Sequence, residues 1–365
     1  MSTTTYGVND SLTNKLWARG LSVEALKATA IAPLIGEGSD SIIQLRNETQ
    51  KSPGDSITYG LRMLLTGAGV TESQVLEGNE EALTTYSTSL LINELRHAVR
   101  VRNKGTIDQQ RVGFNMRTEA RDGLGDWFAD RFSASFFNQV SGYTPQTDTK
   151  YTGLNAVVAH SSNRKVFAAA GASESNTTDE GLESDDVFDL RYIDYAKELA
   201  TTKVSGRPPM RPVMINGRKK FVIYIHPYQA TDLRTSTDTG QWLDIQKAAM
   251  MGGQTTNNPI YTDALGEYHD VVIRVADDVT QGVNSSSGAA ITTVRRAVLL
   301  GAQAATIAYG QGYSEGSAYK WREEEFDYGH ELGVSAGTCF GLKKNVFNSV
   351  DFGVVTVSTY AAAHG

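Results

Sequence analysis

The chain has 365 residues, 40% of them hydrophobic, and a formal net charge of −7. A chain of this length and apolar content can bury one or two packed cores. Its acidic balance argues against a dedicated nucleic-acid-binding protein, which needs a surplus of Lys and Arg on its contact face. The one cysteine, Cys339, excludes an intramolecular disulfide framework and a cysteine-rich zinc site, and the 35 glycines favour turns and short strands over a helical bundle.

Residues 1–40 predict an N-terminal arm. Short helical signals around Trp17 end at Pro33 and the glycines that follow it. Because apolar side chains such as Trp17 are costly to leave in water, we expect this arm to dock on a neighbouring molecule. The segment has no apolar run of signal-peptide length, and no later run reaches membrane-spanning length. We therefore expect a protein that is neither exported by a signal peptide nor inserted in a membrane.

Residues 41–65 predict an over-long β-hairpin. An apolar arm at 41–46 and a returning arm at 56–65 flank a polar tip at 47–55, where Ser-Pro-Gly-Asp supplies a tight turn. The arms carry too few apolar residues to cover each other, and an isolated hairpin is marginally stable in water. We therefore expect another copy of the chain to cover the hairpin. The candidate inter-subunit contacts here are Arg46, Glu48, Lys51 and Asp55.

The clearest predicted helix spans residues 107–140. Apolar residues recur there at three- and four-residue steps, as in an amphipathic helix: Ala120, Leu124, Trp127, Phe128, Phe132, Phe136 and Val140. A helix of this extent would be roughly 45–50 Å long, which suits a structural spine. Before it lie a predicted strand at 84–92 and a basic run that contributes three more candidate contacts, Arg96, Arg100 and Arg102.

The second half of the chain alternates helix and strand signals. In chain order these are a helix over 186–200 capped by Asp185 or Ser184, a buried strand over 221–225, a short helix that begins at Pro227, a helix over 240–251, a strand over 271–275, and an edge or paired strand over 352–360. We find no internal repeat. The pattern therefore predicts an α+β fold with one spine helix.

Two charged segments are candidate contact surfaces. The segment 323–331 holds five carboxylates and His330. This composition suits a divalent metal, but the spacing matches no known calcium or zinc motif, so we favour an acidic edge on which Glu323, Glu325 and Asp327 share one face of a strand. The segment 206–220 is basic, and we expect Arg207 and Arg211 to pair with acidic surfaces on neighbouring copies.

No catalytic constellation is present in the sequence. His226 lies next to Pro227 without a nucleophile or an orienting acid nearby, so we interpret it as a packed histidine at a helix start. There is no Gly-x-Ser-x-Gly elbow, phosphate-binding loop or dinucleotide fingerprint. The sequence therefore predicts no enzyme activity, no cofactor and no metal.

Several motifs resemble one family of tailed-bacteriophage major capsid proteins, found in podoviruses and related phages. The resemblance covers about residues 40–360. It rests on LEGNEEAL (76–83), LRHAVR (95–100), QQR (109–111), FVIYIHPYQATDLR (221–234), RRAVLLGAQAA (295–305), EEEFDYGHELGVSAG (323–337) and the GLKKNVFNSVDFGV that follows. Residues 171–185 and 281–289 look like insertions specific to this lineage.

The resemblance implies the fold shared by tailed-phage and herpesvirus capsids. It implies an N-terminal arm at 1–40, an extended loop at 41–75, a peripheral domain at 76–200 and 321–365 that includes the spine helix 107–140, and an axial domain at 201–320.

The resemblance also implies a function. Subunits would form the hexamers and pentamers of an icosahedral virion shell, assembled in the host bacterial cytoplasm, with a scaffolding protein, a portal and in some relatives a decoration protein. The shell would enclose double-stranded DNA without sequence-specific binding. Two alternatives stay open. An encapsulin-like nanocompartment shell would contain no nucleic acid, and a soluble hydrolase would be a monomer or small oligomer with a pocket.

Overall fold

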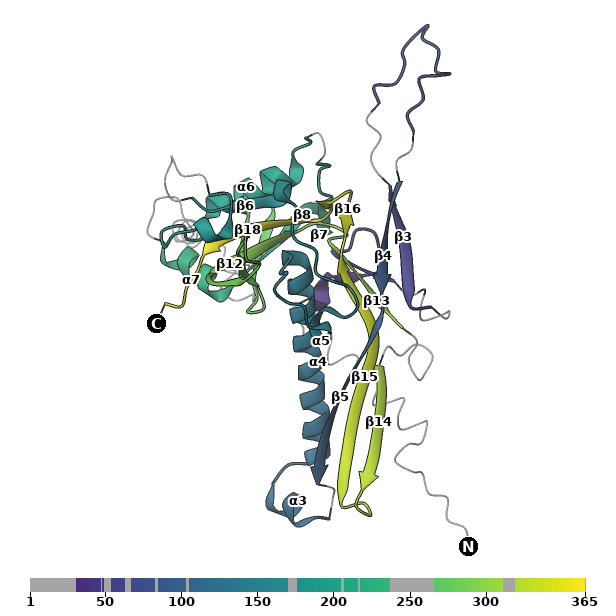
Figure 1. The fold of residues 1–365 in the computed structure, drawn as a ribbon, viewed down its shortest axis with the longest axis vertical. Helices are drawn as coiled ribbons and strands as arrows, with labels where there is room; N and C mark the ends of the chain where they lie inside the picture. Colours follow the sequence, from purple (N-terminus) through teal and green to yellow (C-terminus); the bar gives the residue numbers. More distant parts are fainter. Residues whose placement is uncertain are drawn as a thin grey trace.

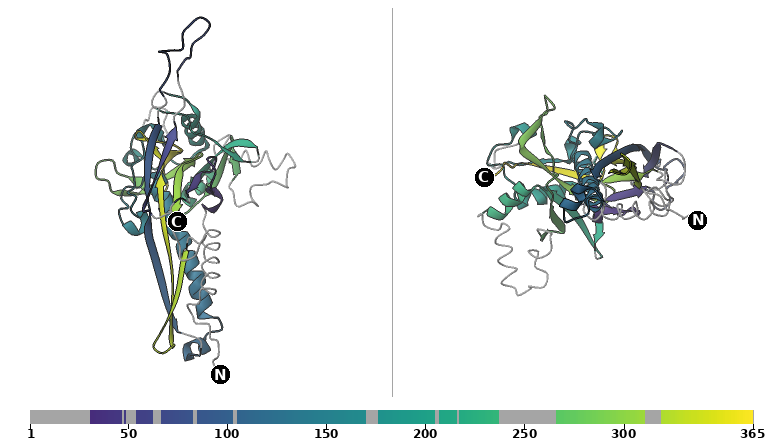
Figure 2. Two further views of the ribbon diagram at one scale, coloured as in Figure 1. Left: turned by 90° about the vertical axis from the view of Figure 1, so that its right-hand side faces the viewer. Right: turned by 90° about the horizontal axis from the view of Figure 1, so that it is seen from below.

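The computed structural model shows an elongated molecule with three recognisable parts. A long arm contains the spine helix, a rounded lobe lies at one end of the arm, and a thin hairpin projects away from both (Figure 1; Figure 2). The structure describes residues 31–46, 48, 54–62, 67–82, 85–102, 105–169, 176–204, 207–215, 217–236, 266–310 and 319–364. The N-terminal arm that we expect at 1–40 and the helix that we expect at 240–251 therefore lie largely or wholly outside the described residues.

The long arm is built on a six-stranded sheet. Along the sheet the strands are β1 (Ile35–Gly36), β2 (Ile43–Arg46), β13 (Ala305–Tyr309), β15 (Glu331–Lys344) and β14 (Tyr319–Phe326), and β5 (Asn93–Arg102) pairs with the other side of β15. A short 3₁₀ helix, η1 (Ala32–Leu34), precedes β1.

The expected pairing between residues 41–46 and 56–65 is wrong. Strand β2 lies parallel to β13, with Ile43 opposite Ala305 and Arg46 opposite Ala308. Strand β3 (Ser56–Arg62) pairs instead with β4 (Thr85–Leu91) in an antiparallel hairpin. The apolar side chains Ile42 and Ile43 are buried in the chain's own core, so β2 needs no second copy to cover it.

The spine is shorter than the sequence predicts, because the helical stretch is divided. Helix α3 (Ile107–Arg111) ends at Val112, which has extended backbone angles, and α4 (Met116–Ser141) begins after Asn115. The Asn115 side chain accepts a hydrogen bond from the Arg117 N–H and so caps the new helix. At 1.5 Å per residue, the 26 residues of α4 extend about 39 Å.

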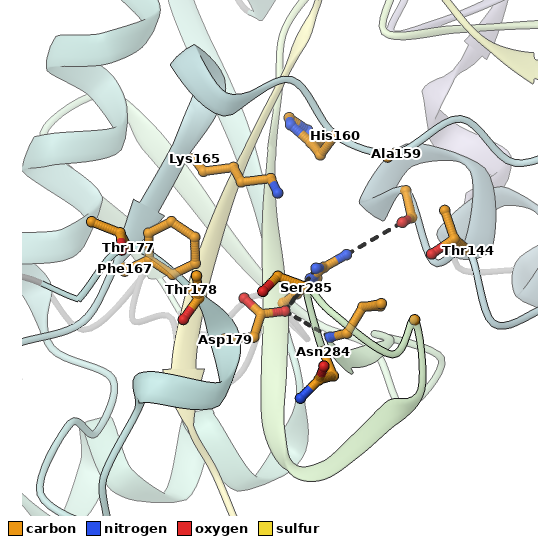
Figure 3. Close-up of a pocket in the computed structure, with 14 residues that line it drawn as sticks. Thr144, Ala159, His160, Lys165, Phe167, Thr177, Thr178, Asp179, Asn284 and Ser285 are labelled. Atoms are coloured by element: carbon orange, nitrogen blue, oxygen red, sulfur yellow. Dashed lines mark hydrogen bonds and ion pairs between the residues drawn. The ribbon is translucent and has the colours of Figure 1, made fainter.

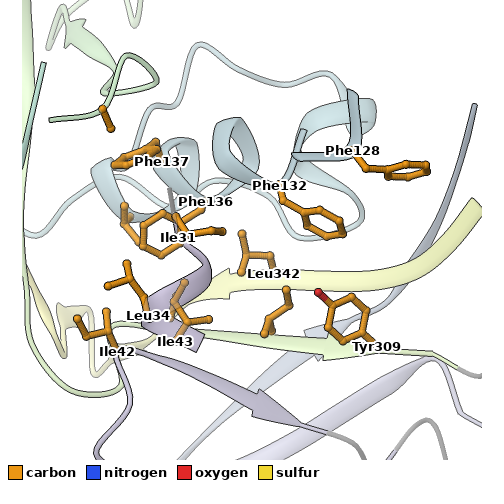
Figure 4. Packing of buried hydrophobic residues seen from close by; sticks show 14 of the residues in the cluster. Ile31, Leu34, Ile42, Ile43, Phe128, Phe132, Phe136, Phe137, Tyr309 and Leu342 are labelled. Atoms are coloured by element: carbon orange, nitrogen blue, oxygen red, sulfur yellow. The ribbon is translucent and has the colours of Figure 1, made fainter. Parts of the chain in front are cut away.

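The apolar stripe of α4 packs against the sheet as predicted. Leu124, Phe128, Phe132, Phe136 and Val140 are buried in one cluster with side chains of β13 and β15 (Figure 4). Trp127 is half-buried and stacks on His97 of β5, with ring centroids 4.4 Å apart. The helix is therefore held mainly by aromatic packing on the strands of its own arm.

The rounded lobe is built on an eight-stranded sheet. Its main order is β6 (Lys165–Phe167), β18 (Val354–Tyr360), β12 (Ala290–Leu300), β8 (Arg218–Ile225), β10 (Val271–Val275) and β9 (Gly266–Tyr268), while β7 (Val213–Ile215) pairs with β8 and β11 (Gln281–Val283) with β12. Strands β6 and β18 lie outside residues 201–320 and still pair into this sheet. The predicted strand near the C-terminus is thus an interior strand, between β6 and β12.

Two helices accompany this sheet. Helix α6 (Leu190–Thr201) buries Tyr192, Ile193 and Ala196 in a core that it shares with β8, β12 and β18. Its N-cap is Asp189, not Asp185 or Ser184, and no side-chain hydrogen bond caps it. Helix α7 (Pro227–Thr235) begins at Pro227 as predicted.

The remaining elements are short. They are α5 (Thr149–Thr152), η2 (Ser162–Arg164), η3 (Asp179–Gly181), β16 (Val346–Phe347) and β17 (Val350–Asp351). In the part of the chain that the structure describes, no helix is long and apolar enough to cross a membrane.

Candidate assembly surfaces

The projecting hairpin is anchored at its root in its own chain. Ile57, Tyr59 and Leu90 of β3 and β4 are buried with Ala308 and Phe347. The Tyr59 hydroxyl donates a hydrogen bond to the Asn345 amide oxygen at 2.5 Å. The described pairing runs from Ser56 opposite Leu91 to Arg62 opposite Thr85, so the tip of the hairpin lies beyond this last pair and not at 47–55.

The tip is acidic and carries uncovered apolar residues. Its described part, 67–82, contains Glu72, Glu77, Glu80 and Glu81 and neither Lys nor Arg. Val75 and Leu76 are 66% and 58% exposed, although large apolar side chains are usually covered. The Glu81 carboxylate accepts a hydrogen bond from the Gly67 N–H at 2.6 Å, which joins the two sides of the tip. The tip thus holds its own shape and leaves its apolar side chains in solvent.

A basic stripe runs along β5. Arg96, Arg100 and Arg102 all have exposed side chains. Within the described residues β5 pairs with β15 on one edge, and no strand pairs with its other edge. An edge strand with exposed arginines offers both backbone hydrogen-bonding groups and positive charge to another molecule.

These three arginines already have carboxylate neighbours within the chain. Arg96 lies 3.8 Å from Glu94, Arg102 lies 3.3 Å from Asp108, and Arg100 contacts Glu331. Exposed ion pairs of this kind contribute only about 0–1 kcal/mol each. The arginines can therefore exchange these partners for carboxylates of another subunit at little cost.

The acidic segment departs from the expected single exposed face. Glu323 is 2% exposed and accepts hydrogen bonds from Arg117 at 2.8 Å and from the Trp321 indole N–H at 3.0 Å. Strand β14 therefore turns Glu323 toward α4, and this residue contacts its own chain. Glu325 is exposed on the strand, whereas Asp327 lies in the following turn with a φ of 52°.

The remaining candidate contacts lie apart from this stripe. Arg46 pairs with Glu48 at 3.3 Å, Asp55 is exposed beside β3, and Lys51 lies outside the described residues. Arg211 reaches Asp40 at 3.0 Å, and Arg207 donates a hydrogen bond to the Asn163 carbonyl at 3.3 Å. None of these contacts involves a β5 arginine.

His226 has the structural role that the sequence predicts. It follows β8 as the N-cap residue of α7. Its ring accepts a hydrogen bond from the Tyr228 N–H, while the Gln229 side chain accepts one from the His226 N–H. This reciprocal pair is a capping box for α7. Among the described side chains, no group of three or more His, Cys, Asp or Glu is placed to hold a metal ion.

A buried ionic cluster was not foreseen from the sequence. Asp351 of β17 lies 2.9 Å from the His160 ring and 2.6 Å from the Lys344 amine, and it accepts a hydrogen bond from the Ser161 hydroxyl at 2.8 Å. Burial lowers the pKa of His160 to about 4, and the neighbouring His160 and Lys344 hold the pKa of Asp351 well below its usual range despite its burial. Because Ser161 contacts the carboxylate and not the imidazole, and the histidine and carboxylate side chains are almost fully buried, the cluster lacks the geometry of a nucleophilic triad. It fixes the loop before β6 to β17.

Comparison with known proteins gives a consistent result over nearly the whole chain. The phage capsid protein family matches residues 5–363. The major capsid protein of Pseudomonas phage KPP25 is 26% identical over 389 residues, covering 96% of each chain. The capsid of Ralstonia phage GP4 is similar in structure with a TM-score of 0.76, at 29% identity and with both chains fully covered. The capsid of cyanophage Pam1 has the same fold, with a TM-score of 0.70 at 20% identity, covering 99% of this chain and 95% of that one.

Proposed function

The chain belongs to the phage capsid protein family, and we propose that it is the major capsid protein from which the hexamers and pentamers of an icosahedral phage head are built around double-stranded DNA. The observation that carries this proposal is the similarity to phage capsid proteins over nearly the whole chain, and the hairpin tip at 67–82 fits it because Val75 and Leu76 lack cover within the described chain. A shell supplies that cover by placing the tip on an adjacent subunit.

We propose that the tip lies against the basic stripe of β5 on the neighbouring subunit. The four glutamates of the tip complement Arg96, Arg100 and Arg102 in charge, and opposite charges across an interface steer association and set its register. The edge of β5 that no described strand pairs with gives the tip backbone a partner as well. Repetition around a ring strengthens a contact that is weak alone, because ring closure makes the last contacts intramolecular.

The parts of the fold take the following roles in this proposal. The peripheral domain comprises α4 with β5, β14 and β15, the axial domain comprises the eight-stranded sheet with α6 and α7, and the β3–β4 hairpin is the extended loop. The proposal includes assembly in the host cytoplasm with a scaffolding protein, a portal and in some heads a decoration protein, and no catalytic role for this chain.

Charge exchange between the two surfaces tests the contact. Changing Glu72, Glu77 and Glu80 to Lys should block shell formation, as should changing the three β5 arginines to Glu; Glu81 is kept because its carboxylate accepts the Gly67 N–H within the tip. A chain that carries both sets of changes should form shells again, because the attraction is restored with reversed sign. Negative-stain imaging of purified particles gives the readout.

Two outcomes would count against the proposal. If both single-surface variants form normal shells, the tip and the stripe do not meet. If the combined variant fails although its subunits melt like the unmodified protein, the two surfaces have other partners. Particles free of nucleic acid from infected cells would instead favour a nanocompartment.

A further inference from the structure

The eight-stranded lobe contains a cavity of about 290 Å³ with a mixed polar and apolar lining. It lies where β6, η3, the turn between β11 and β12, and the residues after α4 come together (Figure 3). Its lining includes the polar side chains Thr144, Lys165, Thr178, Asn284, Ser285 and Arg296. These residues come from four separate parts of the sequence.

The carboxylates around this cavity are already engaged. Asp179 lies 2.7 Å from two nitrogens of the Arg296 guanidinium and accepts the Val283 N–H at 2.7 Å. Glu180 accepts hydrogen bonds from Ser285. Asp351, beyond His160, is bound to Lys344 as described above. Each carboxylate thus has a donor of its own at hydrogen-bond distance.

Within the described residues, Lys165 differs from Arg296 in that no carboxylate lies at hydrogen-bond distance from its amine. Its side chain extends from β6 into the cavity, between His160 and Asp179 (Figure 3). Its amine has no hydrogen-bond or ion-pair partner among the residues that the structure describes. Burial and then the nearby Arg296 lower the pKa of Lys165, and the more distant carboxylates of Asp179, Asp351 and Glu180 offset only part of this effect. An ammonium group donates up to three hydrogen bonds, and an anionic oxygen in the cavity would accept from it.

We propose that this cavity binds a small oxyanion, a phosphate or a carboxylate, with Lys165 as the cation that contacts it. The hydroxyl groups of Thr144 and Thr178 and the amide of Asn284 supply neutral donors around the same space. Hydrogen bonds between an ammonium and an anionic oxygen are among the stronger ones in proteins. Since one water occupies roughly 30 Å³, the cavity has room for a tetrahedral oxyanion together with several waters.

Binding of the anion would connect separate segments of the lobe and stabilise its folded state. The ligand would join β6, the η3 segment and the turn after β11, and a ligand that binds only the folded state raises the midpoint of thermal unfolding. This site adds to the proposed capsid function and does not depend on it, because it lies within one subunit and away from the hairpin tip.

Equilibrium dialysis of the purified full-length protein against labelled inorganic phosphate tests the proposal. We expect saturable binding of one phosphate per subunit at constant ionic strength. Lys165→Met should weaken binding about tenfold or more, the loss expected for one charge-assisted contact. The control is Lys203→Met, which removes the same charge at an exposed position outside the cavity and should leave binding unchanged. Competition by acetate distinguishes a carboxylate site, where acetate displaces phosphate, from a phosphate-selective one.

Two results would overturn the proposal. One is the absence of saturable phosphate and acetate binding to the unmodified protein, which decides the question even if Lys165→Met fails to fold. The other is equal binding by the Lys165→Met and Lys203→Met proteins, which would mean that any bound anion lies elsewhere. Neither result bears on shell assembly, which the charge exchange tests separately.

Discussion

Phe136 lies at the point where α4 joins the two sheets, and its removal should be severely destabilising. The side chain is fully buried, and its ring lies 5.3 Å from that of Phe137, which in turn lies 5.4 Å from Tyr224 of β8. Phe136→Ala would leave a cavity between the arm and the lobe that rigid strands cannot fill. Buried Phe→Ala changes typically cost about 3–5 kcal/mol, a large part of the 5–15 kcal/mol that stabilises most domains.

Phe114→Ala is the matched control for this change. Phe114 lies in the connection between α3 and α4 and is 54% exposed, so its loss should alter the free energy of unfolding by no more than about 0.5 kcal/mol. Denaturant unfolding of unassembled subunits, followed by circular dichroism, would measure both. Equal midpoints for the two variants would refute the view that the aromatic stripe of α4 holds the arm to the lobe.

Three further predictions concern other contacts of the core. Trp127→Ala should destabilise less than Phe136→Ala, because Trp127 is half-buried on His97; equal losses in the same unfolding assay would contradict this. Asp179→Asn should cost about 3–5 kcal/mol by leaving the buried Arg296 without its anion, and a neutral effect on thermal unfolding would show that the pair is not needed. The folded state holds the pKa of His160 near 4 against 6.5 in the unfolded chain, so stability should fall by about 3 kcal/mol as the pH drops from 6.5 to 4. His160→Gln should flatten this part of the pH profile, and an unchanged slope would assign it to other groups.

The individual helices and strands could be predicted from the sequence, because the patterns that specify them lie within short segments. Proline at 227 after an apolar strand predicts a strand that runs into a helix, and β8 and α7 have that form. The apolar steps of the spine likewise identify the buried face of α4. The break at Val112 was also predictable from the sequence, because Gly113 is typical of a helix end and Asn115 is typical of the residue that caps the next helix.

The pairing of the strands could not be predicted from the sequence, because it depends on residues far apart in the chain. The Pro53-Gly54 turn suggested that residues 41–46 and 56–65 pair, but Ile43 is fully buried opposite Ala305, more than 250 positions away. A period of two assigns side chains to two faces of a strand and does not say which face the core will cover. Glu323 is an example: alternation predicts that it shares a face with Glu325, but it does not predict that Glu323 is buried against Arg117 of α4.

Electron microscopy of the purified full-length protein tests the central claim most directly. We expect closed megadalton shells in which residues 67–82 of each subunit lie on β5 of a neighbour, with Val75 and Leu76 covered and the glutamates beside Arg96, Arg100 and Arg102. A monomer or small oligomer, or shells in which the tip touches no other subunit, would contradict it.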